Sequence, residues 1–77
     1  MKFLEWTALV REYAKIFYCW DDVLDDINEA RQAYLDGVPP KEYVDDLAYH
    51  FSLDSYPDLN FGKLPPGFDQ ARYNITP

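Results

Sequence analysis

The sequence is poor in the residues that build covalent and metal-based sites: it has one cysteine, one histidine and three glycines among 77 residues. With Cys19 alone, no internal disulfide can form, which fits a reducing compartment. Zinc needs three or four protein ligands, and His50 has neither a second histidine nor a cysteine pair to complete a site. We therefore expect no disulfide, no metal, no cofactor and a cytoplasmic location.

Long apolar runs are also missing. After Lys2 the hydrophobic residues are interrupted by Glu5, Arg11 and Glu12, so we expect no secretory signal peptide. A membrane span needs about 20 predominantly apolar residues, and no segment approaches that length. The sequence thus predicts a soluble domain with no membrane partner.

Basic residues are scarce, with seven Lys and Arg against fourteen Asp and Glu, for a net charge of −7. The imbalance lies between residues 21 and 46, where nine acidic residues face only Arg31 and Lys41. A negative surface repels nucleic acid and anionic membranes and attracts basic proteins. We expect a basic protein as the partner and no direct contact with nucleic acid.

Aromatic residues, in contrast, are abundant: two Trp, seven Tyr and five Phe. A chain this short buries only about 60% of its unfolded surface, so large rings are its main source of core. In residues 3–20 they recur at helical spacing and predict an amphipathic helix. We expect the core to include Trp6, Tyr13, Phe17, Trp20, Ile27 and Leu47.

Two further helices are predicted, over residues 22–36 and 40–52. Asp21 and Asp22 suit a helix start, and Gly37 suits the left-handed position past a helix end. Pro40 is tolerated at a first helical position, with Val44, Leu47, Ala48 and Phe51 facing inward. Residues 53–77 lose helical periodicity but keep apolar residues, which predicts an irregular strap across the helices that frays after about Ala71. The expected fold is a single all-α domain, 1–77, with three helices.

The best catalytic motif is Asp21-Asp22-x-x-Asp25, which resembles the aspartate-rich motif that holds magnesium and a diphosphate in terpene synthases. That resemblance implies a large helical bundle with a second metal motif, and 77 residues do not provide one. The stretch also lacks the alternate ligands, glycine and closing glutamate of an EF-hand loop. We therefore expect that the protein is not an enzyme.

The acidic residues are the candidate site. On a helix over 22–36 the carboxylates fall on one face opposite the apolar residues, about 5–6 Å apart. Such a row imitates the spacing of DNA phosphates, although a charged outer face is also ordinary for a soluble helix. The candidate partner-binding residues are Asp22, Asp25, Asp26, Glu29, Asp36, Glu42, Asp45, Asp46 and Tyr49.

Tyr49 is included because it points away from the inward face of its predicted helix, among acidic neighbours. Exposed aromatic residues often form the buried centre of an interface. The alternative is that the C-terminal strap covers this ring through Tyr56 or Phe61. Both interpretations remain open at the level of sequence.

In size, charge and the stretches "DDVLDD" and "YVDD", the chain resembles the small acidic inhibitors that phages encode against nucleases, of the anti-CRISPR and anti-restriction class. The resemblance implies a DNA-mimic inhibitor that occupies a basic nucleic-acid groove. A second hypothesis is an immunity protein or antitoxin that neutralises a cationic toxin nuclease. A third is a small structural or adaptor subunit, and the spare aromatic residues leave a homodimer open.

Overall fold

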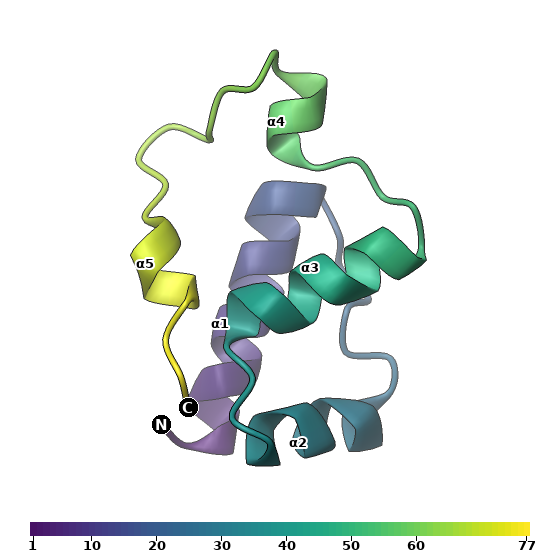
Figure 1. Cartoon of the computed structure of the whole chain (residues 1–77), viewed down its shortest axis with the longest axis vertical. Coiled ribbons are helices and arrows are strands. Elements are labelled where there is room, and N and C mark those ends of the chain that lie inside the picture. Colours follow the sequence, from purple (N-terminus) through teal and green to yellow (C-terminus); the bar gives the residue numbers. More distant parts are fainter.

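The computed structural model describes all 77 residues, and it is helical with no strand. Its radius of gyration, 11.9 Å, is close to the value of about 11.5 Å expected for a folded chain of this length. The helices are α1 (Phe3–Tyr18), α2 (Ile27–Leu35), α3 (Pro40–His50), α4 (Tyr56–Leu59) and α5 (Gln70–Tyr73). Figure 1 shows α3 crossing α1, with α2 at the end of α1 near the N-terminus.

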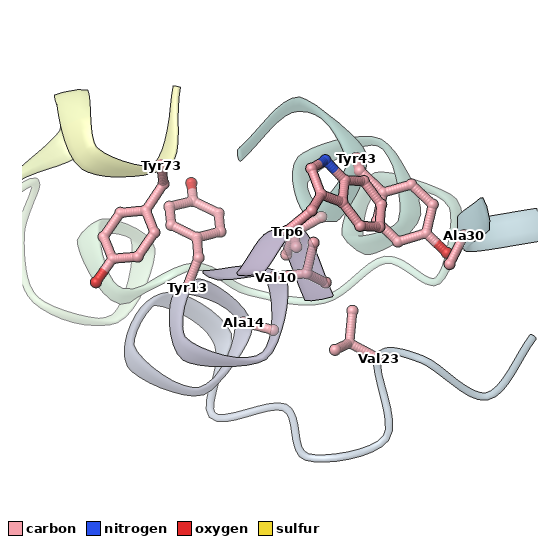
Figure 2. Close-up of a cluster of buried hydrophobic side chains, with 9 residues drawn as sticks. Trp6, Val10, Tyr13, Ala14, Val23, Ala30, Tyr43 and Tyr73 are labelled. Atoms are coloured by element: carbon pink, nitrogen blue, oxygen red, sulfur yellow. The ribbon is translucent and has the colours of Figure 1, made fainter. Parts of the chain in front are cut away.

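The core is built on α1, as its aromatic periodicity predicts. Trp6, Val10, Tyr13 and Ala14 on one face of α1 are fully buried. The Trp6 ring lies 5.1 Å from that of Tyr43 on α3, and Figure 2 shows the two rings side by side. The indole Nε1 of Trp6 also donates to the main-chain carbonyl of Val38 at 2.8 Å, which fastens the connection between α2 and α3 to α1.

An aspartate on α3 holds a second contact between α1 and α3. The hydroxyls of Tyr13 and Tyr18 both donate to Oδ1 of Asp45 at 2.7 Å, and Nζ of Lys41 lies 2.7 Å from Oδ2. Burial, followed by the hydrogen bond to Asp45, raises the pKa of both tyrosines. The two hydroxyls therefore remain neutral donors and join the helices around one carboxylate.

The all-α prediction is confirmed, but the helix count and several boundaries differ. The second helix begins at Ile27, not at residue 22, because Asp26 rather than Asp22 is its N-cap. The first and third helices end at Tyr18 and His50, two residues earlier than predicted. There are five helices, because two single-turn helices form in the part predicted to be irregular.

Some predicted core positions also differ. Phe17, Trp20 and Leu47 pack against the core but are only partly buried. Ile27, the first residue of α2, and Phe51, one residue past the end of α3, are both exposed. Ile16 on α1 is exposed as well.

The C-terminal segment is better anchored than predicted. The Tyr73 side chain is 3% exposed, and its hydroxyl donates to Oε1 of Glu12 at 2.6 Å. Figure 2 shows its ring beside that of Tyr13, with centroids 5.4 Å apart. The expectation that the chain frays after Ala71 is therefore wrong, because α5 carries a core residue past that point.

No helix in the structure combines the length and the apolar character needed to cross a membrane.

Candidate partner-binding site

The segment between α1 and α2 carries three of the candidate carboxylates, Asp22, Asp25 and Asp26. Helix α1 ends in a tight turn in which Cys19 adopts a left-handed conformation, φ 51°, and the Trp20 N–H donates to the Ala14 carbonyl at 3.1 Å. The Cys19 N–H also donates to the Lys15 carbonyl at 3.1 Å, which is the bond of an αL-type helix end. The chain therefore leaves the helix axis at Trp20 and does not continue helically into Asp21 and Asp22.

Val23 and Asp26 then fix the path of the segment. Val23 is buried in the core, which holds the middle of the segment against α1. The Asp26 side chain accepts a hydrogen bond from the Glu29 N–H at 3.1 Å and caps α2. Asp22 and Asp25, on either side of Val23, are left exposed. The first candidates thus lie on a bent loop and a helix start, and not in a row on one helical face.

The loop and helices enclose a pocket of about 350 Å³. Its acidic residues are four of the predicted ones, and its other residues are apolar or aromatic. The acidic set is Asp22, Asp25, Asp26 and Glu29. The apolar set is Trp20, Val23, Tyr43, Leu47, Phe51 and Leu53.

Two further pockets share lining residues with the first or with each other. One of about 380 Å³ shares Glu29, Tyr43 and Leu47 with it and adds Asp36, Asp46 and His50 among its lining. A third, of about 330 Å³, shares Asp46 with the second and is lined by Lys41, Glu42, Asp45 and Asn74. We call the three together the acidic trough. Eight of the nine predicted residues line it.

Tyr49 is the predicted residue that the trough does not include. Its side chain is 87% exposed, so the C-terminal strap does not cover it. Phe61, one of the residues proposed as a cover, is itself 99% exposed. Tyr49 is therefore an isolated aromatic residue on the outer face of α3, outside the pocket walls.

Few of the acidic side chains are neutralised within the protein. Only Asp45 and Glu12 form ion pairs, with Lys41 and Arg72 respectively. Arg31, the other basic residue of the acidic segment, stacks over the Phe3 ring at 5.3 Å. The trough therefore keeps nearly all of its negative charge.

The charge acts on a tyrosine in the trough wall. Burial, and then the negative charges of Glu29 and Asp26, raise the pKa of Tyr43. Its hydroxyl stays protonated at neutral pH and remains a neutral donor in a negative environment. Asp45 has a structural role, because, unlike the other carboxylates of the trough, it accepts three hydrogen bonds from side chains of the protein.

Sequence reasoning missed the apolar interior of the first pocket. Trp20, Leu47 and Phe51 were assigned to the core, and Leu53 to the strap, yet all four line this pocket. No sequence signal marked them, because Trp20 and Phe51 fell inside the predicted helices 3–20 and 40–52, whereas the helices end at Tyr18 and His50.

The structure places no group of three or more histidine, cysteine or carboxylate side chains where they would hold a metal ion. No family model matches the sequence, and no match was found among curated proteins or solved structures.

Proposed function

We propose that this chain is a protein–protein inhibitor whose acidic trough docks on a basic surface of its partner. The partner is the basic nucleic-acid-binding groove of a host nuclease or defence complex, as in phage-encoded inhibitors of the DNA-mimic type. The supporting observation is the trough itself: eight acidic residues line three pockets that share lining residues, and the only basic side chains among them are Lys41 and His50. Lys41 is already paired with Asp45.

Concentrated charge of one sign favours a binding role over a purely solubilising one. Dispersed or mixed charges would keep the chain soluble without mutual repulsion, and like charges at close spacing destabilise the folded state. A basic partner removes that repulsion and gains steering during encounter. The proposal rests on unpaired charge and not on phosphate-like spacing, because Asp22, Asp25 and Asp26 precede α2.

The proposal places the protein in the cytoplasm, without enzymatic activity and without direct contact to nucleic acid or membrane. An immunity protein against a cationic toxin nuclease would use the same trough in the same way. An adaptor subunit or homodimer is favoured by a different observation, the nearly complete exposure of Tyr49 and Phe61. Such a surface would bind through apolar area and would depend weakly on salt.

The test compares two charge-reversal variants as baits in a bacterial lysate. Asp25→Lys/Glu29→Lys changes the trough, whereas Glu5→Lys/Asp54→Lys makes the same change in net charge at exposed residues that line none of the pockets. Asp26 is left intact because it caps α2. Circular dichroism first verifies that both variants fold.

We expect the wild type and the Glu5/Asp54 variant to retain a basic nucleic-acid-binding protein at low salt. The Asp25/Glu29 variant should lose it, and duplex DNA in excess should displace it from the wild type. Salt should weaken retention, because exposed charge pairs are screened within about 8–10 Å at physiological ionic strength. Equal retention by both variants, or retention that DNA does not disturb, would refute the proposal.

A further inference from the structure

The first pocket of the trough combines an apolar interior with four carboxylates in its lining, a combination that solubility alone does not require. Its interior is formed by large apolar side chains from three places in the chain: the end of α1, the middle of α3 and the residues after α3. Phe51, in its wall, is 62% exposed even though its ring lies 5.9 Å from that of Trp20, so the chain leaves most of this residue open to solvent. An open apolar surface of this kind is unfavourable in water unless a partner buries it.

The chain's own C-terminal segment does not fill the pocket. In Figure 1 the segment after α3 rises to α4, and α5 lies at the left, on the opposite side of α1 from the loop that precedes α2. On α5, the Tyr73 hydroxyl donates to Glu12 and the Tyr73 ring packs against the Tyr13 ring. The occupant must therefore come from another molecule.

The charge around the pocket defines that molecule. Asp22, Asp25, Asp26 and Glu29 line it, no basic side chain does, and none of the four is in an ion pair. An anionic ligand would be repelled, and a neutral apolar one would leave the carboxylates uncompensated. The complementary occupant carries an apolar side chain for the interior and lysine or arginine for the rim.

The volume and the continuation of the trough indicate a peptide segment. About 350 Å³ is near the lower end of the roughly 300–1,000 Å³ of small-molecule sites, and suits one or two side chains better than a cofactor. The second pocket continues past Glu29 to Asp36 and Asp46, so a longer occupant meets further carboxylates beyond the first.

The absence of strands determines how such a segment binds. The fold offers no sheet edge, so an extended peptide has no exposed strand with which to form main-chain hydrogen bonds. Recognition must proceed through side chains, as when an amphipathic helix lays its apolar face in a groove. We infer that the first pocket receives the apolar face of a basic amphipathic helix of the partner, with its lysines and arginines on the four carboxylates.

This inference rests on the proposed function, since it names the part of the partner that the trough would bind, but it is tested separately. The probe is a synthetic basic amphipathic helix with a leucine face flanked by lysine and arginine. Its matched control replaces the leucines with glutamine, which keeps the charge and a good helix propensity. A second control replaces the basic residues with glutamate.

The readout uses the two indole N–H signals of ¹⁵N-labelled protein. Trp20 lines the pocket, whereas Trp6 is fully buried with its indole N–H bonded to the Val38 carbonyl. The Trp20 signal should therefore move on titration while the Trp6 signal stays in place, with the Trp20→Phe variant providing the assignment. The leucine peptide should also gain helix, measured by circular dichroism.

We expect the glutamine peptide to bind at least about tenfold more weakly than the leucine peptide, as for loss of an anchor residue. The glutamate peptide should not bind. Phe51→Ala should weaken binding of the leucine peptide about tenfold. Phe61→Ala, at a phenylalanine that is 99% exposed and outside the pocket, should leave binding within about twofold of the wild type. Circular dichroism establishes that both variants fold.

Three results would overturn the inference: equal binding of the leucine and glutamine peptides, an unmoved Trp20 signal, or binding without gain of helix. None of these results bears on the lysate test, which depends only on charge. Conversely, a trough that binds the leucine peptide but captures no basic protein displaceable by DNA would support the pocket chemistry and refute the proposed function.

Discussion

Asp45 and Asp46 are adjacent acidic residues on α3, and the sequence predicted the same partner-binding role for both. The structure predicts that removing Asp45 destabilises the fold much more than removing Asp46. Asp45 accepts hydrogen bonds from Tyr13, Tyr18 and Lys41, whereas Asp46 is exposed and has no hydrogen bond to a side chain of the protein. Replacing either by alanine gains similar helix propensity, which cancels in the comparison. The difference between the two variants therefore measures the hydrogen-bond network.

The size of the effect follows from burial. Tyr13 is fully buried, so a hydroxyl without its acceptor costs about 1–3 kcal/mol. Tyr18 and Lys41 are partly exposed, so water replaces some of their bonding, and together they add about 0.5–1.5 kcal/mol. Asp45→Ala should therefore lower the free energy of unfolding by about 1.5–4.5 kcal/mol, and Asp46→Ala by no more than about 0.5 kcal/mol.

Urea denaturation followed by circular dichroism measures both values. Tyr13→Phe removes the buried hydroxyl, so in that background Asp45→Ala should cost about 1–2 kcal/mol less, a coupling typical of residues in direct contact. If Asp45→Ala and Asp46→Ala unfold at the same urea concentration, the network does not stabilise the fold. The assignment of Asp45 to structure rather than to the partner surface would then be wrong.

Three further predictions use the same denaturation assay. Asp26→Ala removes the acceptor of the Glu29 N–H and should cost about 0.5–2 kcal/mol; no loss would mean that α2 needs no cap. Phe17→Ala should cost about 2–4 kcal/mol, below the full value for a buried ring because Phe17 is partly exposed, and a loss below about 1 kcal/mol would contradict its place in the core. Burial and Glu12 raise the pKa of Tyr73 from 10.0 to about 12, so its contribution is complete below pH 10 and lost as the pH rises toward 12; Tyr73→Phe should make this alkaline loss shallower, and an unchanged profile would contradict the assignment.

The sequence predicted the parts of the fold that depend on local periodicity. The apolar spacing of residues 3–20 located α1 and its buried face, since Trp6 and Tyr13 are fully buried. Pro40 correctly marked the start of α3. Both signals are local, because they need only the helical repeat and the chemistry of helix ends.

The start of α2 was mispredicted because Asp21 and Asp22, which directly follow the predicted first helix, also suit a helix start. The Asp26 cap forms in the structure, because burying Val23 while α1 turns at Cys19 requires a non-helical segment between them. That requirement is tertiary and has no local sign.

Two features depended on contacts between distant residues. The burial of Tyr73 requires Glu12, 61 positions earlier. The separation of Asp45 from Asp46 requires Tyr13, 32 positions before Asp45. Charge pattern alone placed both aspartates on the partner surface, since a single sequence contains no information on such pairings.

The displacement of the acidic residues from a helical row to the edge of a pocket changes what they are suited to bind. A regular row of carboxylates on a polar face presents charge alone, and its attraction for a cation falls steeply as salt is added. Asp22, Asp25, Asp26 and Glu29 instead surround Trp20 and Phe51, whose burial by a partner is insensitive to such screening. In the proposed complex, charge would govern the rate and specificity of encounter, and the apolar contact would govern how long the complex lasts. The proposed surface is thus suited to a partner segment that is both basic and apolar rather than to a bare polyelectrolyte or a small cation.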